Sequence, residues 1–496
     1  MRLTAFLFST LLTALMVSAA EPQVIKPERG RNLVGRVTVD GASRQGVVVS
    51  DGVNVVTTDE NGVYQMNSSG RQHVFVSVPA DCKIPLENGM PKIYEEIDFG
   101  DRKHPVQIDF RLESCAKAEN FTLVAMADIQ PGDLVEIAML DEQIMPGMEE
   151  FASTLSGNVY GISLGDVVWN NPALYDSYKT HIRRMGIPVF HVIGNHDHNE
   201  FVHDDTLSDK EFRDAFGPTY YSCNIGDWHL VALDDILMSG IRGRSDYTGE
   251  ITPQQLDWLR KDLSHVDKDK SIIIGVHIPT MRRNAPARVN NADSLYELLK
   301  DFKDVRILSG HTHYNFKTDI APNITEQTVA SMMGAFWNGD ICDDGSPRGF
   351  AVYEFDGNKI ANNYYKGSAT PRDYQIKIYQ PKEASYRFGK DSEGKPNKID
   401  NDSVLINVFF WHTDWKVELK EDDKDWVTLT NDFILDPEAV KLYQGKNPWE
   451  KRPSAEPTKR NDHMFLYKPS KRKWKTITVR ATDPYGNVYS TTEKRK

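Results

Sequence analysis

Cysteine is scarce in this chain, with four residues in a length of 496. So few cysteines in so long a chain exclude a fold that is held together by a disulfide scaffold. Cys82 and Cys115 fall in one segment, and the sequence leaves open whether they pair; Cys223 and Cys342 are expected to be half-buried thiols. The core must come from apolar packing, for which a hydrophobic content of 40% is ample.

Positive charge is also in short supply. The chain has 59 Lys and Arg against 71 Asp and Glu, which gives a net charge of −12. Basic residues gather only weakly, at Arg282 and Arg283 and in the stretch KRKWK that begins at Lys471. Because a nucleic-acid-binding surface needs a basic face, no nucleic-acid polymer is expected as a partner.

Long apolar runs are missing after the first twenty residues, so no transmembrane span is expected. Residues 1–20, MRLTAFLFSTLLTALMVSAA, combine one basic residue, a short apolar stretch and a small-residue end, which is typical of a secretory signal peptide. The apolar stretch is shorter than the roughly 20 residues that a membrane anchor needs. No cysteine follows it directly, so a lipidated amino terminus is not expected. We predict an exported protein, either periplasmic or secreted.

The length of the chain indicates several domains, because a single hydrophobic core rarely extends over this many residues. Residues 21–115 alternate short β-rich runs with turn signals such as Asp59-Glu-Asn-Gly62, which predicts an N-terminal β-sandwich domain. In residues 119–368, buried strand patterns alternate with amphipathic helices, one of which has a good start at Thr252-Pro253. This pattern predicts an α/β layered domain. Residues 371–496 return to β-type runs, which predicts a C-terminal β-sandwich domain.

The strands of the middle domain end in side chains that can bind metal. In chain order these are Asp128 and Gln130; Asp166; Asn195, His196 and Asp197; His277; and His311 and His313. Ligands of open α/β sheets bind at the carboxyl ends of the strands, so residues distant in sequence converge there. A single polar residue at a strand end is usually structural, but five such ends in succession make coincidence improbable.

These motifs resemble the calcineurin-like metallophosphoesterase family, whose pattern is D-x-H, G-D, G-N-H-D/E, H and G-H-x-H. The resemblance runs from Asn120 to Tyr365. The flanking regions resemble the extra N- and C-terminal β domains of a secreted bacterial subgroup. The resemblance implies an α/β layered metallophosphoesterase domain, a β-sandwich core flanked by helices, between two all-β sandwich domains.

The resemblance also implies two adjacent divalent metal ions, with Asp166 shared between them. One ion would be held by Asp128, Gln130, Asp166 and His313, and the other by Asp166, Asn195, His277 and His311. Mixed oxygen and nitrogen ligands suit Mn, Fe or Zn. Two such ions can clamp a phosphoryl group and activate a water molecule. His196 is implied to act beside the phosphate, with Asp197 orienting it.

Two positions depart from relatives. Gln130 stands where the common pattern has histidine; its amide oxygen can ligate a metal but is a poorer donor, so a weaker first metal site is expected. Trp169 stands where purple acid phosphatases have a tyrosine ligand, and an indole cannot ligate metal, so that class is disfavoured.

Further candidates for substrate binding lie near these motifs. Arg282 and Arg283, with Arg288, follow the strand of His277, and guanidinium groups recognise phosphate. Trp169 and Trp337 are candidates for an aromatic substrate wall, together with Asn170 and Phe336. For each of these, a structural role is the alternative.

We therefore predict a two-metal-dependent hydrolase of phosphate esters. The specific expectation is a phosphodiesterase that acts on an exported or extracellular phosphorylated small molecule, glycan or lipid headgroup. One alternative is a phosphomonoesterase of the same family. Another is a non-catalytic, carbohydrate-binding surface protein with a vestigial metal centre. The sequence leaves open the substrate, the native metal pair and the oligomeric state.

Overall fold

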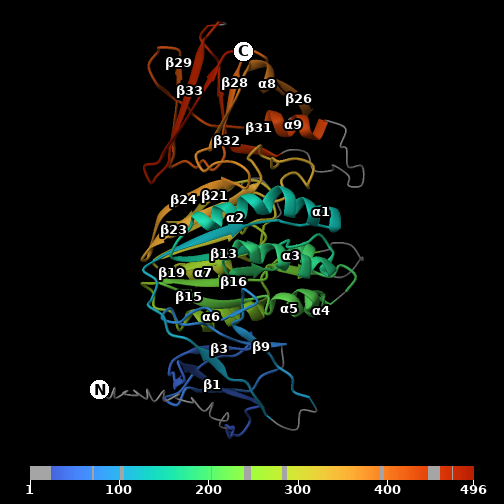
Figure 1. The fold of residues 1–496 in the computed structure, drawn as a ribbon, viewed down its shortest axis with the longest axis vertical. Coiled ribbons are helices and arrows are strands. Elements are labelled where there is room, and N and C mark those ends of the chain that lie inside the picture. The colour runs from blue at the N-terminus through green and yellow to red at the C-terminus, as the bar shows by residue number, and fades with distance from the viewer. Residues whose placement is uncertain are drawn as a thin grey trace, which may run out of the picture.

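A computed structural model describes residues 24–69, 72–100, 105–202, 204–239, 247–281, 288–390, 396–444, 459–471 and 473–496. An N-terminal β region, a central α/β region and a C-terminal β region are stacked in chain order along the longest axis (Figure 1). The predicted signal peptide, residues 1–20, lies outside the described residues and stays a prediction. No helix among the described residues combines the length and the apolar character needed to cross a membrane.

The N-terminal region is built from two small sheets, as expected from its short β-rich runs. In one sheet, β1 pairs with β2, β5, β10 and β11; the other has the order β4-β3-β6-β9, and β7 and β8 form a separate hairpin. The bounds are β1 (Leu33–Val39), β2 (Ala42–Ser43), β3 (Val48–Ser50), β4 (Val55–Thr57), β5 (Val63–Met66), β6 (His73–Val76), β7 (Leu86–Glu87), β8 (Met90–Pro91), β9 (Tyr94–Glu96), β10 (Val106–Gln107) and β11 (Phe110–Leu112).

The central region contains two facing sheets. The first is five-stranded with the order β14-β13-β12-β23-β24, and the second is six-stranded with the order β15-β16-β19-β20-β22-β21. Strands β12, β13 and β14 run parallel, and so do β16, β19, β20 and β22. The bounds are β12 (Asn120–Met126), β13 (Asn158–Leu164), β14 (Val189–Val192), β15 (Tyr221–Ile225), β16 (Trp228–Ala232), β17 (Ile236–Met238), β18 (Tyr247–Gly249), β19 (Ser271–Gly275), β20 (Asp304–Ser309), β21 (Phe316–Ala321), β22 (Ile324–Thr328), β23 (Gly349–Asp356) and β24 (Lys359–Gly367).

Successive side chains of β12 point to opposite faces of the first sheet and so join different layers of the central region. Leu123 and Ala125 point into the core shared with the second sheet, whereas Val124 and Met126 join the cluster formed with the first helices. Helices α1, α2 and α3 therefore cover the outer face of the first sheet, and α6 and α7 pack with the second. The bounds are α1 (Leu134–Met139), a π-helical turn η1 (Leu140–Ile144), α2 (Met145–Thr154), η2 (Pro172–Leu174), α3 (Tyr175–Ile182), η3 (Arg183–Met185), η4 (Asn195–Asp197), α4 (Asp205–Ser208), α5 (Lys210–Phe216), α6 (Pro253–Leu263) and α7 (Ala292–Leu299).

The start of helix α6 and the fold class both agree with the predictions from the sequence. Thr252 caps α6 by accepting a hydrogen bond from the Gln255 backbone, with Pro253 at the first helical position, as predicted. The layered α/β region, a β-sandwich core flanked by helices, is confirmed together with the two flanking β regions.

The C-terminal region is a second β structure. Its two four-stranded sheets have the orders β25-β28-β32-β31 and β30-β29-β33-β34. Ile378, Val417 and Phe465 belong to the core that these sheets share. The bounds are β25 (Ile376–Tyr379), α8 (Pro381–Ala384), β26 (Tyr386–Lys390), β27 (Pro396–Ile399), β28 (Val404–Val408), β29 (Lys416–Glu421), β30 (Val427–Thr428), β31 (Asp432–Leu435), α9 (Pro437–Gln444), β32 (Arg460–Tyr467), β33 (Thr476–Thr482) and β34 (Val488–Lys494).

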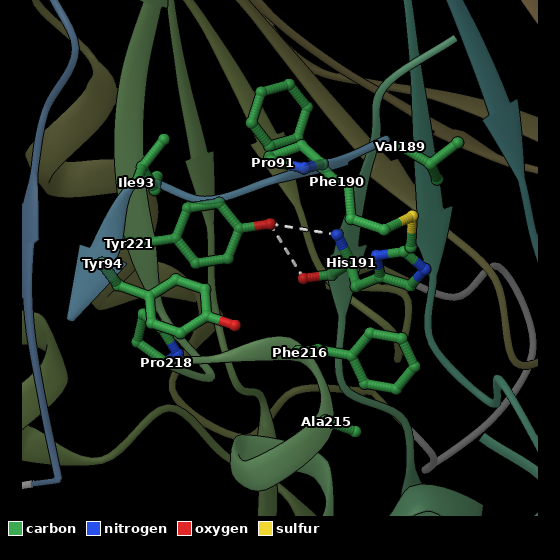
Figure 2. Close-up of a pocket in the computed structure, with 11 residues that line it drawn as sticks. Pro91, Ile93, Tyr94, Val189, Phe190, His191, Ala215, Phe216, Pro218 and Tyr221 are labelled. Carbon is green, nitrogen blue, oxygen red and sulfur yellow. Dashed lines mark hydrogen bonds between the residues drawn. The ribbon is translucent and has the colours of Figure 1, made fainter. Parts of the chain in front are cut away.

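The N-terminal region docks against the outer side of the second sheet and α6. Trp258 Nε1 on α6 donates to Ser50 Oγ at 3.0 Å, and the Tyr220 hydroxyl donates to Gly52 O at 2.7 Å. Figure 2 shows a small pocket lined by residues of both the N-terminal and the central region, where Tyr94 of β9 faces Tyr221 of β15. The Tyr221 hydroxyl donates to His191 O and accepts from His191 N, at 2.9 and 3.0 Å. The bonds of Trp258 and Tyr220 tie the N-terminal region to the central region, and those of Tyr221 join the two sheets of the central region.

All four cysteines are free thiols in the structure, so Cys82 and Cys115 are not joined. Cys82, Cys223 and Cys342 are buried, which makes the last two more buried than expected. Burial raises the pKa of Cys82 to about 11.

Candidate metal centre

The strand ends that the sequence singles out converge on one edge of the central region. Asp128, Asp166 and Asn195 follow β12, β13 and β14, which are neighbours in the first sheet. His277 follows β19, while His311 and His313 follow β20, its neighbour in the second sheet. Because these strands are parallel within each sheet, their carboxyl ends meet at the same edge.

Asn195, His277 and His311 form what we call the histidine half of the centre. His277 Nε2 lies 3.1 Å from Asn195 Oδ1, 3.2 Å from His311 Nδ1 and 3.3 Å from Asp166 Oδ1. One potential ligand atom each from Asp166, His277 and His311 lies within 4.8 Å of the others. His277 Nδ1 faces Leu164 O at 2.8 Å, so Nδ1 carries a proton and Nε2 is the atom presented to the centre.

Asp128, Gln130 and His313 form the glutamine half. His313 Nε2 lies 3.3 Å from Asp128 Oδ1, and Gln130 Nε2 donates to Asp166 Oδ2 at 2.8 Å. Asp166 therefore lies between the halves, because its Oδ1 faces His277 and its Oδ2 faces Gln130.

Two buried oxygens of the glutamine half accept no regular hydrogen bond. Gln130 Oε1 has no hydrogen-bond partner, and Asp128 Oδ1 has only the ion-pair contact with His313; the two side chains are 1% and 0% exposed. Leaving a buried polar atom without a partner costs about 1–3 kcal/mol, so such atoms need an explanation. A divalent cation that these oxygens ligate is such an explanation, and the donor set fits one.

The backbone is strained where these side chains are presented. Asp128, Gln130, Asp166, His311 and His313 all have positive φ, between 49° and 65°. Such conformations cost a non-glycine residue of order 1–3 kcal/mol and cluster at functional sites. The other described non-glycine residues with positive φ are Asn170, Phe336 and Trp337, in loops next to the centre, and Asp40, Asn88 and Asp422, in surface turns.

Glycines precede two of the candidate ligands, Asp166 and Asn195, and allow neighbouring strand ends to approach each other closely. A Cβ on Gly165 would lie 2.4 Å from His277 Nδ1, and one on Gly194 would lie 2.1 Å from Asp166 N. Both contacts are far shorter than a van der Waals distance. Glycine is needed at both positions because strand ends pack closely here, between the two sheets at Gly165 and within the first sheet at Gly194.

The charges of the centre reinforce each other. Burial alone would raise the pKa of Asp166, but His277 and His196 hold it well below its usual range. Burial would likewise lower the pKa of His313, but Asp128 and Asp343 raise it above its usual value. The Asp166 carboxylate is therefore ionised and available as a ligand.

His196 lies beside the centre, and its described ring contacts are with Trp169 and Asn170. Its backbone N donates to Asp166 Oδ1 at 2.8 Å, its ring stacks on Trp169 at 4.3 Å, and its Nδ1 faces Asn170 Oδ1 at 2.8 Å. Asp197 instead accepts from the backbone N–H groups of Val167, Val168 and Gly194. The predicted role of Asp197 in orienting His196 stays a prediction, and the described contacts of its carboxylate are with the buried peptide groups of the loop after β13 and of Gly194. Asn170 orients the ring.

The candidates for substrate contact divide into three groups. Arg282 and Arg283 lie outside the described residues, and Arg288 is exposed. Trp337 is buried and donates its Nε1 to Gln130 O at 3.3 Å, so it packs behind the glutamine half and is no part of a substrate wall. Trp169 and Phe336 are half-buried and lie edge to face at 5.5 Å; that they form a substrate wall stays a prediction.

Two buried carboxylates support His277 and were not singled out from the sequence. Asp235 accepts from the backbone N–H groups of His277 and Ile278, at 3.1 and 2.8 Å. Glu326 accepts from the backbone N–H groups of Thr280 and Met281 in the same loop. Asp235 directly follows the β16 region in the stretch HLVALDD, which is the same strand-end signal that marked the other sites.

Comparison with known proteins agrees with this geometry. The family model for calcineurin-like phosphoesterase matches residues 121–315, and those for the N-terminal and C-terminal parts of calcineurin-like phosphoesterase match residues 31–115 and 326–489. The C-terminal match begins within β22, so it includes part of the central region.

Individual relatives match shorter stretches. A probable cyclic nucleotide phosphodiesterase from Psychrobacter arcticus is 32% identical over 162 residues, which cover 30% of this chain and 54% of the relative. One from a Synechococcus species is 28% identical over 151 residues, covering 29% and 54%. The chain thus spans about half the length of the curated relatives it matches. A solved dimetal phosphatase from Danio rerio superposes with a TM-score of 0.34 and 15% identity, covering 47% of this chain and 92% of that one.

The three family models together follow the order of the three regions in the structure, and the motifs of the central match are the residues that converge at the strand ends. The chain belongs to the calcineurin-like phosphoesterases, a class of metal-dependent phosphoester hydrolases, and has the N- and C-terminal domains of that family.

Proposed function

We propose that this protein is a phosphodiesterase that uses two divalent metal ions, of the class Mn, Fe or Zn. The observation that carries the proposal is the position of Asp166 between two sets of donors, with one oxygen toward each. The glutamine half, with Asp166, would hold one ion, and the histidine half, with Asp166, the other. When bound, such a pair polarises a phosphoryl group and supplies an activated water molecule.

The chain's own residues supply orientation and proton transfer. Asn170 Oδ1 can only accept, so Nδ1 of His196 carries a proton and Nε2 is left to face the substrate. In its neutral form Nε2 accepts a hydrogen bond, and in its charged form it donates a proton to the leaving oxygen. Trp169 holds the ring from one face, which fixes the direction in which Nε2 points.

The two curated relatives favour a diester over a monoester as the substrate, because each is named a probable cyclic nucleotide phosphodiesterase.

The wall of Trp169 and Phe336 favours a substituent with a flat or apolar face. A nucleotide diester has such a face, and so does an aryl ester used as a probe. We further propose that the protein acts outside the cytoplasm, on an exported or extracellular phosphorylated molecule, because residues 1–20 have the pattern of a secretory signal peptide.

The test compares bis-p-nitrophenyl phosphate with p-nitrophenyl phosphate, using protein loaded with Mn²⁺ and Asp166→Ala as the inactive control. We expect kcat/KM for the diester to exceed that for the monoester, and both rates to vanish in the control. A higher kcat/KM for the monoester would contradict the phosphodiesterase proposal and identify the protein as a phosphomonoesterase. Two bound metal ions with no turnover of either ester would contradict the enzymatic proposal.

A further inference from the structure

The C-terminal region reaches the metal centre through a buried polar network. Its central member is Asp344, in the turn that joins Cys342 to Ser346 in the central region. Asp344 is 0% exposed, and so is Asn407 on β28; His463 on β32 is 1% exposed. A buried network of hydrogen bonds at such depth favours one arrangement of its members.

His463 binds the turn from the side of the C-terminal region. Its Nε2 lies 3.1 Å from Asp344 Oδ2, and its Nδ1 lies 2.7 Å from Asn407 Oδ1. Asn407 uses its amide nitrogen for Asp344 O and Asp436 Oδ2, so its oxygen faces His463. Both ring nitrogens of His463 thus face hydrogen-bond acceptors, Asp344 Oδ2 on one side and Asn407 Oδ1 on the other.

The same Asp344 carboxylate binds the loop that carries His313. Asp344 Oδ2 accepts from Asn315 N at 2.8 Å, two residues after His313. The Asn315 side chain then accepts from Ala330 N at 3.0 Å. One oxygen of Asp344 is therefore shared by His463 of the C-terminal region and by the end of the His311–His313 loop.

The network continues to the other carboxylate of the glutamine half. Ser331, next to Ala330, forms a parallel bridge with Ala127, and Met332 N donates to Ala127 O at 2.8 Å. Ala127 precedes Asp128. The network thus supports the backbone on both sides of the glutamine half, at His313 and at Asp128, whereas the supports of His277 described above lie within the central region.

We propose that His463 and Asp344 are positioning residues for the glutamine half of the metal centre. This inference rests on the proposed function, and it makes the C-terminal region part of the scaffold of the site. By holding Asn315 and the segment after β22, the pair keeps His313 and Asp128 at the spacing that a cation requires. Loss of the pair should weaken one of the two metal ions and leave the other in place.

The structure offers a matched control in His412, a second buried histidine of the C-terminal region. His412 also faces a carboxylate of the central region, with Nε2 3.6 Å from Asp319 Oδ2 on β21, and its Nδ1 lies 3.3 Å from Asp414 Oδ1. Its described contacts do not include the loop of His311–His313. Removing either histidine disturbs the same interface, but only His463 is bonded to that loop through Asp344.

The experiment titrates Mn²⁺ into wild type, His463→Ala, His463→Gln and His412→Ala by calorimetry, with thermal unfolding of the metal-free proteins alongside. We expect both alanine variants to lower the unfolding temperature. His463→Ala should weaken the more weakly bound Mn²⁺ about tenfold, the lower end of the effect of residues that support metal ligands. His412→Ala should leave both ions unchanged. His463→Gln keeps one donor toward Asp344 and should recover part of the loss.

Unchanged Mn²⁺ binding in His463→Ala, or equal weakening in His463→Ala and His412→Ala, would overturn the inference while leaving the proposed function intact. A wild-type protein that takes up fewer than two Mn²⁺ ions would instead remove the proposed function, and this inference with it. If His463→Ala does not fold, Asp344→Asn takes its place in the same comparison, since it preserves the volume of the side chain and replaces the carboxylate that faces both His463 and Asn315.

Discussion

The two halves of the metal centre differ in how their candidate ligands are held in place. In the histidine half, His277 touches both Asn195 and His311, and Asp235 and Glu326 hold its loop within the central region. In the glutamine half, Asp128 Oδ1 and Gln130 Oε1 accept no regular hydrogen bond, and support comes from a network that extends into the C-terminal region. On our proposal, the ion site of the histidine half is preorganised by neighbours within the central region, whereas that of the glutamine half depends on its cation and on the C-terminal region.

The largest expected effect is that of Asp166→Ala, which removes the residue common to both halves. Turnover of bis-p-nitrophenyl phosphate should fall by roughly a thousandfold or more, because about 4 kcal/mol of transition-state stabilisation depends on the paired ions. Metal analysis of the same variant should show loss of both ions. Retention of one tightly bound ion would mean that Asp166 is not shared.

The variant His277→Ala should distinguish the metal affinities of the two halves. It removes the donor at the centre of the histidine half, and we expect the tighter Mn²⁺ to be weakened by roughly a hundredfold or more. His313→Ala, the matched change in the glutamine half, should affect only the weaker ion. Calorimetric titration of both variants checks this, and the same loss in each would erase the distinction between the halves.

Asn170→Ala lies outside both halves and tests the orientation of His196. Loss of its contact with Nδ1 should slow turnover about tenfold, the effect of a hydrogen bond worth about 1.4 kcal/mol. Metal content should stay at the wild-type value, which steady-state kinetics with metal analysis can establish. Loss of metal in this variant would show that Asn170 supports the ligands themselves.

The smallest effect is expected from Gln130→His. Histidine tolerates the positive φ of 51° at this position, and imidazole is a better donor than an amide. The weaker Mn²⁺ should bind roughly fivefold more tightly, with activity retained. Gln130→Ala is its control: if that change alters neither Mn²⁺ affinity nor rate, the glutamine only completes a turn.

Much of the centre could be predicted from the sequence because its signals are local. Asp128, Asp166 and Asn195 each follow an apolar run directly, and parallel strands bring their ends together whatever the loops do. The roles of their neighbours could not be predicted. Asn170 reaches His196 through a left-handed backbone turn, and Asp197 is drawn to peptide groups some thirty residues earlier.

Loop packing and contacts between domains also could not be predicted from the sequence. Trp337 carries the same aromatic signal as Trp169, yet its loop folds behind Gln130 and buries it. His463 lies 119 residues from Asp344, and nothing in its own strand marks it as different from a core histidine. Such pairs arise from the docking of whole regions, which local patterns do not encode.

The central claim is that Asp166 joins two metal sites of unequal strength. The most direct test is a calorimetric titration of metal-free wild-type protein with Mn²⁺. The geometry predicts two ions per chain with two separate affinities. A single ion, no ion, or two ions of equal affinity would contradict it.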